Sequence, residues 1–208
     1  MLKQRIGQVA LVIGLAGLCA ACGASRPYKY YVLDVNPPAP SAQPAAYPIQ
    51  LIVGRVNAPE LYRDSRIVYG SGDVQLGAYE YERWAEMPAE MLQQSLISTL
   101  RATGQYHSVT AISSSARGEY IVRGRLISLY GVDKPNLVAR FSMEVDLSDS
   151  KTGETIWSDT YSHDEPVDGK TVANVIEAMD RDVRAGMNQF AANLGQYFAA
   201  HPPQTSQN

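Results

Sequence analysis

Two cysteines, Cys19 and Cys22, are the only thiols in this chain of 208 residues, and both lie near its beginning. They follow a short cationic start, with Lys3 and Arg5, and an uncharged run over residues 9–18. A cationic start, an apolar run and small residues at a cleavage point are the three parts of a secretory signal peptide. The apolar run makes roughly 15 Å of helix, about half of a ~30 Å hydrocarbon core, so it is too short to span a membrane.

Cys22 has the better sequence context for lipid attachment. Two alanines precede it, and this small pair resembles the bacterial lipobox, where a peptidase cuts ahead of a cysteine that carries diacylglycerol. The match departs at one place, because Cys19 stands where the lipobox usually has leucine. Cys19 itself is a poor acceptor, since Leu18 occupies the place of a small residue. We predict a signal peptide over residues 1–21 and lipidation of Cys22; the alternative is an ordinary signal peptide that leaves Cys22 free or disulfide-bonded.

Lipidation would decide where the mature chain resides. Removal of residues 1–21 from the 208 leaves 187, enough for one domain with a buried core. A chain acylated at Cys22 has no free thiol, and so no disulfide and no thiolate metal site. Three acyl chains, such as palmitate, hold a protein firmly where one does not. Gly23, in place of aspartate, favours the outer membrane by analogy with the sorting rule of enteric bacteria, so we expect an outer-membrane lipoprotein that faces the periplasm.

Other side chains with catalytic potential are scattered. The three histidines are far apart in the sequence: His107, His163 and His201. No serine stands in a G-x-S-x-G elbow. Five acids gather around a predicted hairpin and the loop after it: Asp149, Asp159, Asp164, Glu165 and Asp168. We interpret these acids as solvated surface, with a calcium or paired-carboxylate site as the alternative, and we predict no enzyme activity, no cofactor and no metal.

The balance of aromatic and charged residues points to protein partners. The formal net charge of −3 offers no basic stripe for nucleic acid. Thirteen tyrosines stand against three phenylalanines, and tyrosine, tryptophan and arginine are the usual anchors of interfaces. The predicted partner-binding residues are Tyr62, Arg63, Arg66, Tyr69, Tyr81, Arg83 and Trp84. The alternative for Trp84 is that it caps the hydrophobic core.

Hydrophobic periodicity predicts the elements that position these residues. Strands are expected at residues 30–35, 49–56, 67–69, 74–79, 109–112, 119–130, 137–148 and 155–162. Helices are expected from Pro88 to about Gly104 and, with an unbroken apolar stripe, over residues 171–198. The fold class is α+β, a single domain in which two helices, the C-terminal one long, pack on an antiparallel or mixed sheet. Residues 22–48 form the lipidated N-terminus, first strand and proline-rich tether; 49–200 form the domain; 201–208 form a polar tail.

Several stretches in this order resemble a known family. They are the leader with its lipobox, Tyr30-Tyr31-Val32-Leu33-Asp34, Arg66-Ile67-Val68-Tyr69, Tyr81-Glu82-Arg83-Trp84-Ala85-Glu86-Met87-Pro88 and the long last helix. Together they resemble the ABC-type transport auxiliary lipoproteins of the PqiC type, which accompany MCE-domain lipid transporters. The resemblance implies a non-enzymatic part of a phospholipid transport system that supports envelope integrity. It implies a periplasmic MCE-domain protein as partner and, indirectly, an ABC permease and ATPase.

Other functions are compatible with the residues alone. An outer-membrane lipoprotein that activates a peptidoglycan synthase is the second hypothesis, and a lipid or glycan hydrolase is the third. The tether of about 25 residues has a random-coil span of about 25–30 Å, which favours a domain held close to its membrane. A partner ring would present repeated surfaces, so a homo-oligomer is a further expectation.

Overall fold

A computed structural model describes residues 26–33, 45–71, 74–113, 115–133 and 136–203. Cys22, the predicted signal peptide and most of the proline-rich tether lie outside these residues. The described strands are β1 (Lys29–Tyr31), β2 (Tyr47–Val53), β3 (Arg66–Ser71), β4 (Gln75–Trp84), β5 (Tyr106–Ala111), β6 (Tyr120–Val132), β7 (Val138–Asp149) and β8 (Thr155–Pro166). The helices are the 3₁₀ turn η1 (Glu60–Tyr62), α2 (Pro88–Ala102) and α3 (Val172–Ala200).

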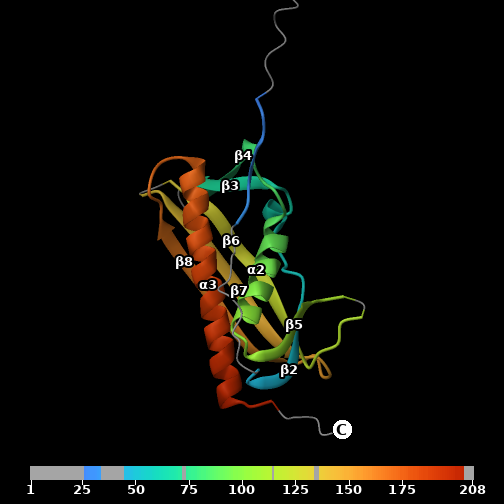
Figure 1. The fold of residues 1–208 in the computed structure, drawn as a ribbon. Helices are drawn as coiled ribbons and strands as arrows, with labels where there is room; N and C mark the ends of the chain where they lie inside the picture. Colours follow the sequence, from blue (N-terminus) through green and yellow to red (C-terminus); the bar gives the residue numbers. More distant parts are fainter. Residues whose placement is uncertain (1–25, 34–44, 72–73, 114, 134–135, 204–208) are drawn as a thin grey trace, which may run out of the picture.

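The sheet is mixed and forks at its longest pairing. Strand β6 pairs antiparallel with β7, and β7 with β8, over nearly their full lengths. The other edge of β6 is shared by two strands, because β2 runs parallel to its beginning and β3 parallel to its end. One branch continues from β2 to β5, and the other from β3 to β4 and then β1. The fold is thus a single α+β domain with an open sheet of eight strands (Figure 1).

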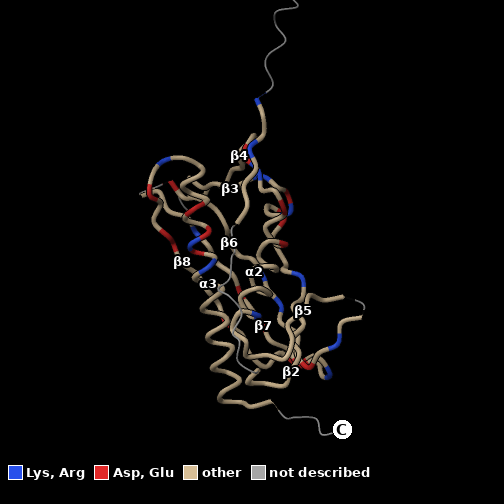
Figure 2. Tube along the Cα trace, viewed as in Figure 1, with Lys and Arg blue, Asp and Glu red and all other residues tan. Residues whose placement is uncertain are grey.

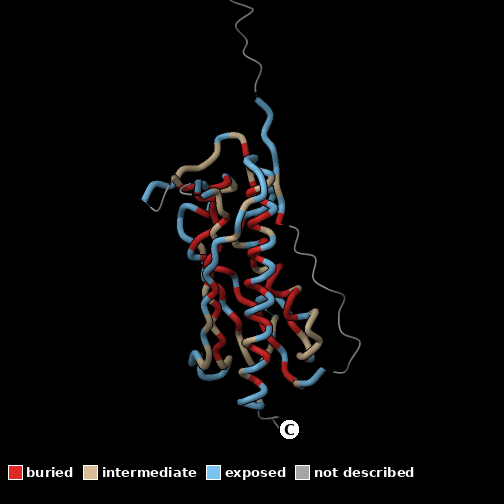
Figure 3. The backbone as a smooth tube through the Cα atoms, turned by 90° about the vertical axis from the view of Figure 1, so that its left-hand side faces the viewer, coloured by how far each residue is buried: buried red, intermediate tan, exposed pale blue. Residues whose placement is uncertain are grey.

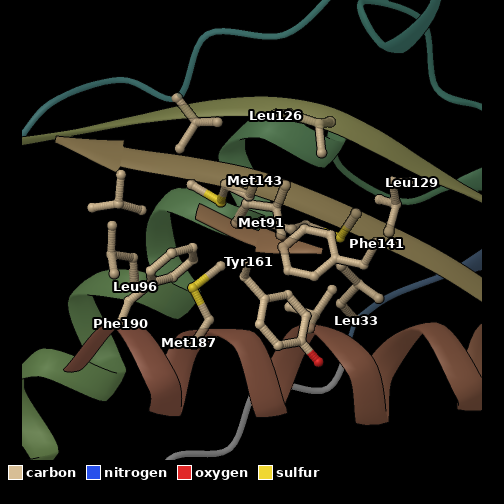
Figure 4. Close-up of a cluster of buried hydrophobic side chains, with 14 of the residues drawn as sticks. Leu33, Met91, Leu96, Leu126, Leu129, Phe141, Met143, Tyr161, Met187 and Phe190 are labelled. Carbon is tan, nitrogen blue, oxygen red and sulfur yellow. The ribbon is translucent and has the colours of Figure 1, made fainter. Parts of the chain in front are cut away.

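The two long helices lie on the same face of this sheet (Figure 1). Helix α3 packs on β7 and β8 and contacts α2, which in turn packs on β5. The core between helices and sheet contains Phe141 and Met143 of β7 and Met187 and Phe190 of α3, all at most 1% exposed (Figure 4). None of the described helices has an apolar stretch long enough to cross a membrane.

The start of α3 is fixed by its own sequence. Thr171 is the N-cap, and its hydroxyl accepts a hydrogen bond from the backbone N–H of Asn174. The Asn174 side chain accepts one in return from the Thr171 backbone N–H, which completes a capping box. From there the helix runs 29 residues, about 43 Å at 1.5 Å per residue, along the sheet.

The predicted elements are found, and the main differences are in length. The helix from Pro88 and the strand over residues 137–148 match α2 and β7 closely. Strand β4 extends to Trp84 and β8 to Pro166, beyond the predicted ends at 79 and 162. In β4 the additional residues follow an irregularity in the pairing with β3, which interrupts the simple alternation. In β8 the additional pairing takes in acids that arginines neutralise, such as Asp164 beside Arg140.

Candidate functional site

Arginine and tyrosine side chains of β4 and of the residues just before β1 interleave at the N-terminal end of the domain. The guanidinium of Arg26 lies over the ring of Tyr81, 5.1 Å from its centroid. The Tyr81 ring lies 6.0 Å from that of Tyr28, and the Arg83 guanidinium lies 4.9 Å from the centroid of Tyr28. We call Arg26, Tyr81, Tyr28 and Arg83 the arginine–tyrosine row. Each cation–π contact in such a row contributes about 0.5–1 kcal/mol at an exposed site.

Asp64 extends the row toward β3. Its carboxylate accepts hydrogen bonds from the Arg66 backbone N–H at 2.8 Å and from Arg66 Nε at 2.7 Å, and it also contacts Arg83 Nη1 at 3.3 Å. The Arg66 backbone N–H, together with the two guanidinium groups, holds the pKa of the Asp64 carboxyl below its usual value. Arg66 and Asp64 remain accessible, with side chains 48% and 41% exposed. A partner can therefore contact both the Asp64 carboxylate and the Arg66 guanidinium.

A buried carboxylate fixes β1, and with it half of the row, onto β4. Glu82 is 7% exposed, accepts a hydrogen bond from the Tyr31 hydroxyl at 2.8 Å and pairs with Lys29 Nζ at 3.3 Å. Burial and the hydrogen bond to Glu82 raise the pKa of Tyr31 to about 12. Because β1 and β4 pair in register from Lys29 and Glu82 onward, these links set the position of Tyr28 against Arg83.

A groove of about 540 Å³ lies close to the row, where the sheet forks. One wall is the segment after β2, including Arg55 and Asn57, and the other is the start of α2, including Met87 and Gln93. The Gln93 side chain donates a hydrogen bond to the Gly54 carbonyl at 2.9 Å, which ties the helix to the fork. The groove is mixed in character, with cationic, apolar and amide groups, as is common for protein-binding surfaces.

The residues predicted to bind a partner divide into buried and accessible ones. Tyr62 and Trp84 are 4% and 2% exposed, so both belong to the core. The Tyr62 hydroxyl accepts a hydrogen bond from the Leu129 backbone N–H, although its ring still lines the groove. The accessible ones are Arg63, Arg66, Tyr69, Tyr81 and Arg83.

The accessible residues do not all lie in one place. Arg66, Tyr81 and Arg83 come together around Asp64 and Tyr28, whereas Arg63 pairs with Glu60 on the groove wall. Tyr69 packs instead on Tyr79, with ring centroids 4.7 Å apart. The sequence patterns did not single out Arg26 and Tyr28. Arg26 and Tyr28 stand at every second position before Tyr30, and this alternation is the sequence pattern that could have indicated them.

The acidic residues are engaged by nearby groups of the protein. Arg140 binds Asp164, Arg181 binds Glu165, and Asn193 donates to Asp159. Asp149 accepts hydrogen bonds from the backbone of its own turn. Among the described residues, no group of three His, Cys, Asp or Glu side chains could hold a metal ion. The acids therefore take part in the structure of β7, β8 and α3.

One carboxylate, Asp182 of α3, lies inside the core. It is 1% exposed, accepts a hydrogen bond from the Tyr161 hydroxyl at 2.7 Å, and has Nδ1 of His163 at 3.0 Å. Its second oxygen has no hydrogen-bond partner among the described residues. Burial raises the pKa of Asp182, and the hydrogen bonds from Tyr161 and His163 only partly oppose this.

Asp182→Asn is expected to flatten the pH dependence of stability. Because the pKa of Asp182 is raised on folding, its stabilising contribution is complete below the unfolded pKa of about 3.9 and is lost as pH rises through the folded pKa. Asparagine keeps the shape and can accept from Tyr161 without a buried charge. Urea titrations between pH 4 and 8 should give a shallower slope for the variant. His163→Gln is the control for the imidazole, and an unchanged slope in Asp182→Asn would contradict the assignment.

Comparison with protein families identifies the class of protein that carries this row and groove. Residues 31–191 match the ABC-type transport auxiliary lipoprotein component family, and the chain belongs to that family. The match runs from Tyr31, the last residue of β1, through most of α3. It therefore includes Asp64, Tyr81 and Arg83, but not Arg26 and Tyr28. No curated protein matches the chain.

Solved structures share the fold at low sequence identity. A crystal structure of a DUF330-family protein from Xanthomonas campestris is 18% identical, with a TM-score of 0.73 over 83% of this chain and 99% of that one. A second crystal structure, of an uncharacterised protein, is 16% identical, with a TM-score of 0.59 over 83% and 99%. A protein of Chlamydia trachomatis is 9% identical, with a TM-score of 0.50 over 74% and 99%.

Proposed function

We propose that this chain is a non-enzymatic lipoprotein, anchored through Cys22 to the periplasmic side of the outer membrane, that serves as an adaptor in an MCE/ABC-type phospholipid transport system. The observation that carries the proposal is the family match over residues 31–191. Its name specifies an auxiliary lipoprotein of an ABC-type transporter. The outer-membrane location and the MCE-domain partner are proposed in addition to what the family description states.

The surface geometry supports a role in binding. The arginine–tyrosine row, Asp64 and Arg66 offer aromatic and charged groups at the ends of β1, β3 and β4, and contacts among these groups hold them in place. Pre-organised aromatic and arginine side chains are the groups that most often anchor a protein interface. The adjoining groove of about 540 Å³ can receive a side chain or loop of the partner.

The partner is identified by crosslinking in cells, followed by pull-down from envelopes and mass spectrometry. Recovery of an MCE-domain protein, reduced in Cys22→Ala, is the expected result, because the anchor concentrates the domain at its membrane. Recovery of a peptidoglycan synthase in its place would overturn the transporter proposal. A defect in phospholipid distribution upon deletion, restored by the wild type, is the functional readout.

Charge reversal at the two arginines that contact Asp64 is expected to weaken partner binding. Arg66→Glu combined with Arg83→Glu places two carboxylates beside Asp64, which should lower the affinity for the recovered partner at least about tenfold, since losing 1.4 kcal/mol has that effect. The change is measured by calorimetry or surface plasmon resonance with purified proteins. Lys151→Glu, in the exposed turn between β7 and β8, is the matched control with the same type of charge change. Unaltered affinity in a folded double variant would place the interface elsewhere.

A further inference from the structure

Strand β1 and the residues beside it present an apolar side to solvent. Tyr28, Tyr30 and Val32 are 52%, 65% and 58% exposed. The residues that alternate with them point the other way: Lys29 and Tyr31 bind Glu82, and Leu33 is 7% exposed in the core. The alternation matches the period of an extended chain, in which successive side chains lie on opposite faces. We call Tyr28, Tyr30 and Val32 the β1 outer row.

This row has no cover within the described part of the chain. The Tyr30 side chain has no hydrogen bond and no ring contact with any described residue. Tyr28 contacts Arg83 and Tyr81 but is still 52% exposed. The segment that contains the row forms the outermost tip of the described molecule and is mostly exposed (Figure 3). Three large apolar side chains, one in β1 and one on either side of it, are therefore available for contact.

The position of the row along the chain identifies what it can contact. Only residues 23–25 separate Cys22 from Arg26, and four Cα–Cα steps span at most about 14 Å in any conformation. A polar headgroup layer is about 5–8 Å thick on each side of a bilayer. If Cys22 is acylated, as the proposed function requires, Arg26 lies within or just above the headgroups, and Tyr28 is only two residues further on.

We propose that the β1 outer row docks on the lipid surface of the membrane that holds the anchor. Tyrosine is suited to this boundary, because its ring is apolar and its hydroxyl can stay hydrated. Arg26, which precedes the row and is exposed, places positive charge where anionic headgroups lie. Figure 2 shows Lys and Arg at this tip and along the β4 end of the domain. Contact through β1 would fix the orientation of the domain, since Glu82 and the β1–β4 pairing join β1 rigidly to the sheet.

In this orientation β3 and β4 lie on the side of the domain that faces the membrane, whereas the C-terminal end of α3 points away from it (Figure 1). A partner protein would then meet the arginine–tyrosine row at its accessible flank while the β1 outer row contacts lipid. The two surfaces share Arg26 and Tyr28, whereas Tyr30 and Val32 belong to the lipid contact and Arg66, Tyr81 and Arg83 to the partner contact. The domain would thus make two contacts, one with lipid and one with a partner protein.

The test uses the full-length, acylated protein reconstituted in vesicles of phosphatidylethanolamine and phosphatidylglycerol. Because the predicted mature chain has no thiol other than Cys22, single cysteines can be labelled with an environment-sensitive fluorophore at Tyr30→Cys and Val32→Cys. Ala199→Cys, exposed at the far end of α3, is the control position. We expect a blue-shifted emission and at least a twofold quenching by spin-labelled lipids at 30 and 32, and neither change at 199.

The outcomes separate this inference from the proposed function. If mass spectrometry finds no acyl chains on Cys22, the anchoring proposal fails. If the protein is acylated but positions 30 and 32 are quenched no more than 199, the docking inference alone is overturned. A blue shift that appears without vesicles and grows with protein concentration would assign the row to a second copy of the chain and would also overturn it.

Discussion

Trp84→Ala is expected to destabilise the whole domain by about 3–5 kcal/mol, as is usual for truncating a large buried aromatic residue. Trp84 ends β4 with 2% of its surface exposed, and its backbone N–H donates to the Ser65 carbonyl at 2.6 Å. Strand β1 pairs beside it, through Tyr31. A cavity at this position would loosen β1, β4 and the start of α2 together. Urea unfolding followed by circular dichroism measures the change.

The control for this prediction is an exposed aromatic residue on the neighbouring strand. Tyr30→Ala removes a ring that is 65% exposed, and its effect should stay within about 0.5 kcal/mol. The pair of variants separates two interpretations of Trp84, as a core residue or as a contact for a partner. A Trp84→Ala protein with wild-type stability and lost partner binding would favour the second interpretation and contradict its burial.

Sequence periodicity predicts best the elements that bury one clean face. Strand β7 alternates from Ala139 to Leu147, and α3 keeps apolar residues at helical spacing from Val175 to Phe198. Each element buries one side and leaves the other more exposed, so local sequence is sufficient to predict it. This is why the α+β class and the long last helix follow from the order of the residues alone.

The candidate site depends on pairings that local patterns do not encode. Strands β1 and β4 are parallel neighbours although Tyr31 and Trp84 are 53 residues apart in sequence. The arginine–tyrosine row exists only because this pairing brings Tyr28 beside Arg83. The fork has the same origin, since β2 and β3 share one edge of β6. Composition indicated that tyrosine and arginine would contribute to a binding surface. It left burial of Trp84 in the core as an alternative, and it did not indicate that Tyr62 is buried.

Gly186→Val is the second substitution expected to have a large effect, because two core rings lie close to α3 at this position. A Cβ atom at Gly186 would lie 2.8 Å from Tyr161 Cδ1 and 2.9 Å from Phe141 Cε1. Figure 4 shows these two rings side by side between β7, β8 and α3. Their centroids are 5.7 Å apart, and Phe141 is fully buried, so neither ring can withdraw easily. We expect a loss of about 3 kcal/mol in the free energy of unfolding, the upper part of the usual range for overpacking.

A graded series isolates the steric cause from helix propensity. Gly186→Ala gains up to about 1 kcal/mol of helix propensity but must still displace a ring, so it should destabilise less than valine does. Ala185→Val, one residue earlier and exposed, carries only the propensity cost of about 0.5 kcal/mol. Thermal and urea unfolding of the three variants should therefore show by far the largest loss for Gly186→Val. Gly186→Ala would contradict this account if it stabilised the protein by the full gain in helix propensity. The close approach of the two rings would then not be the reason for a glycine at this position, and α3 would have room to move away from β7 and β8.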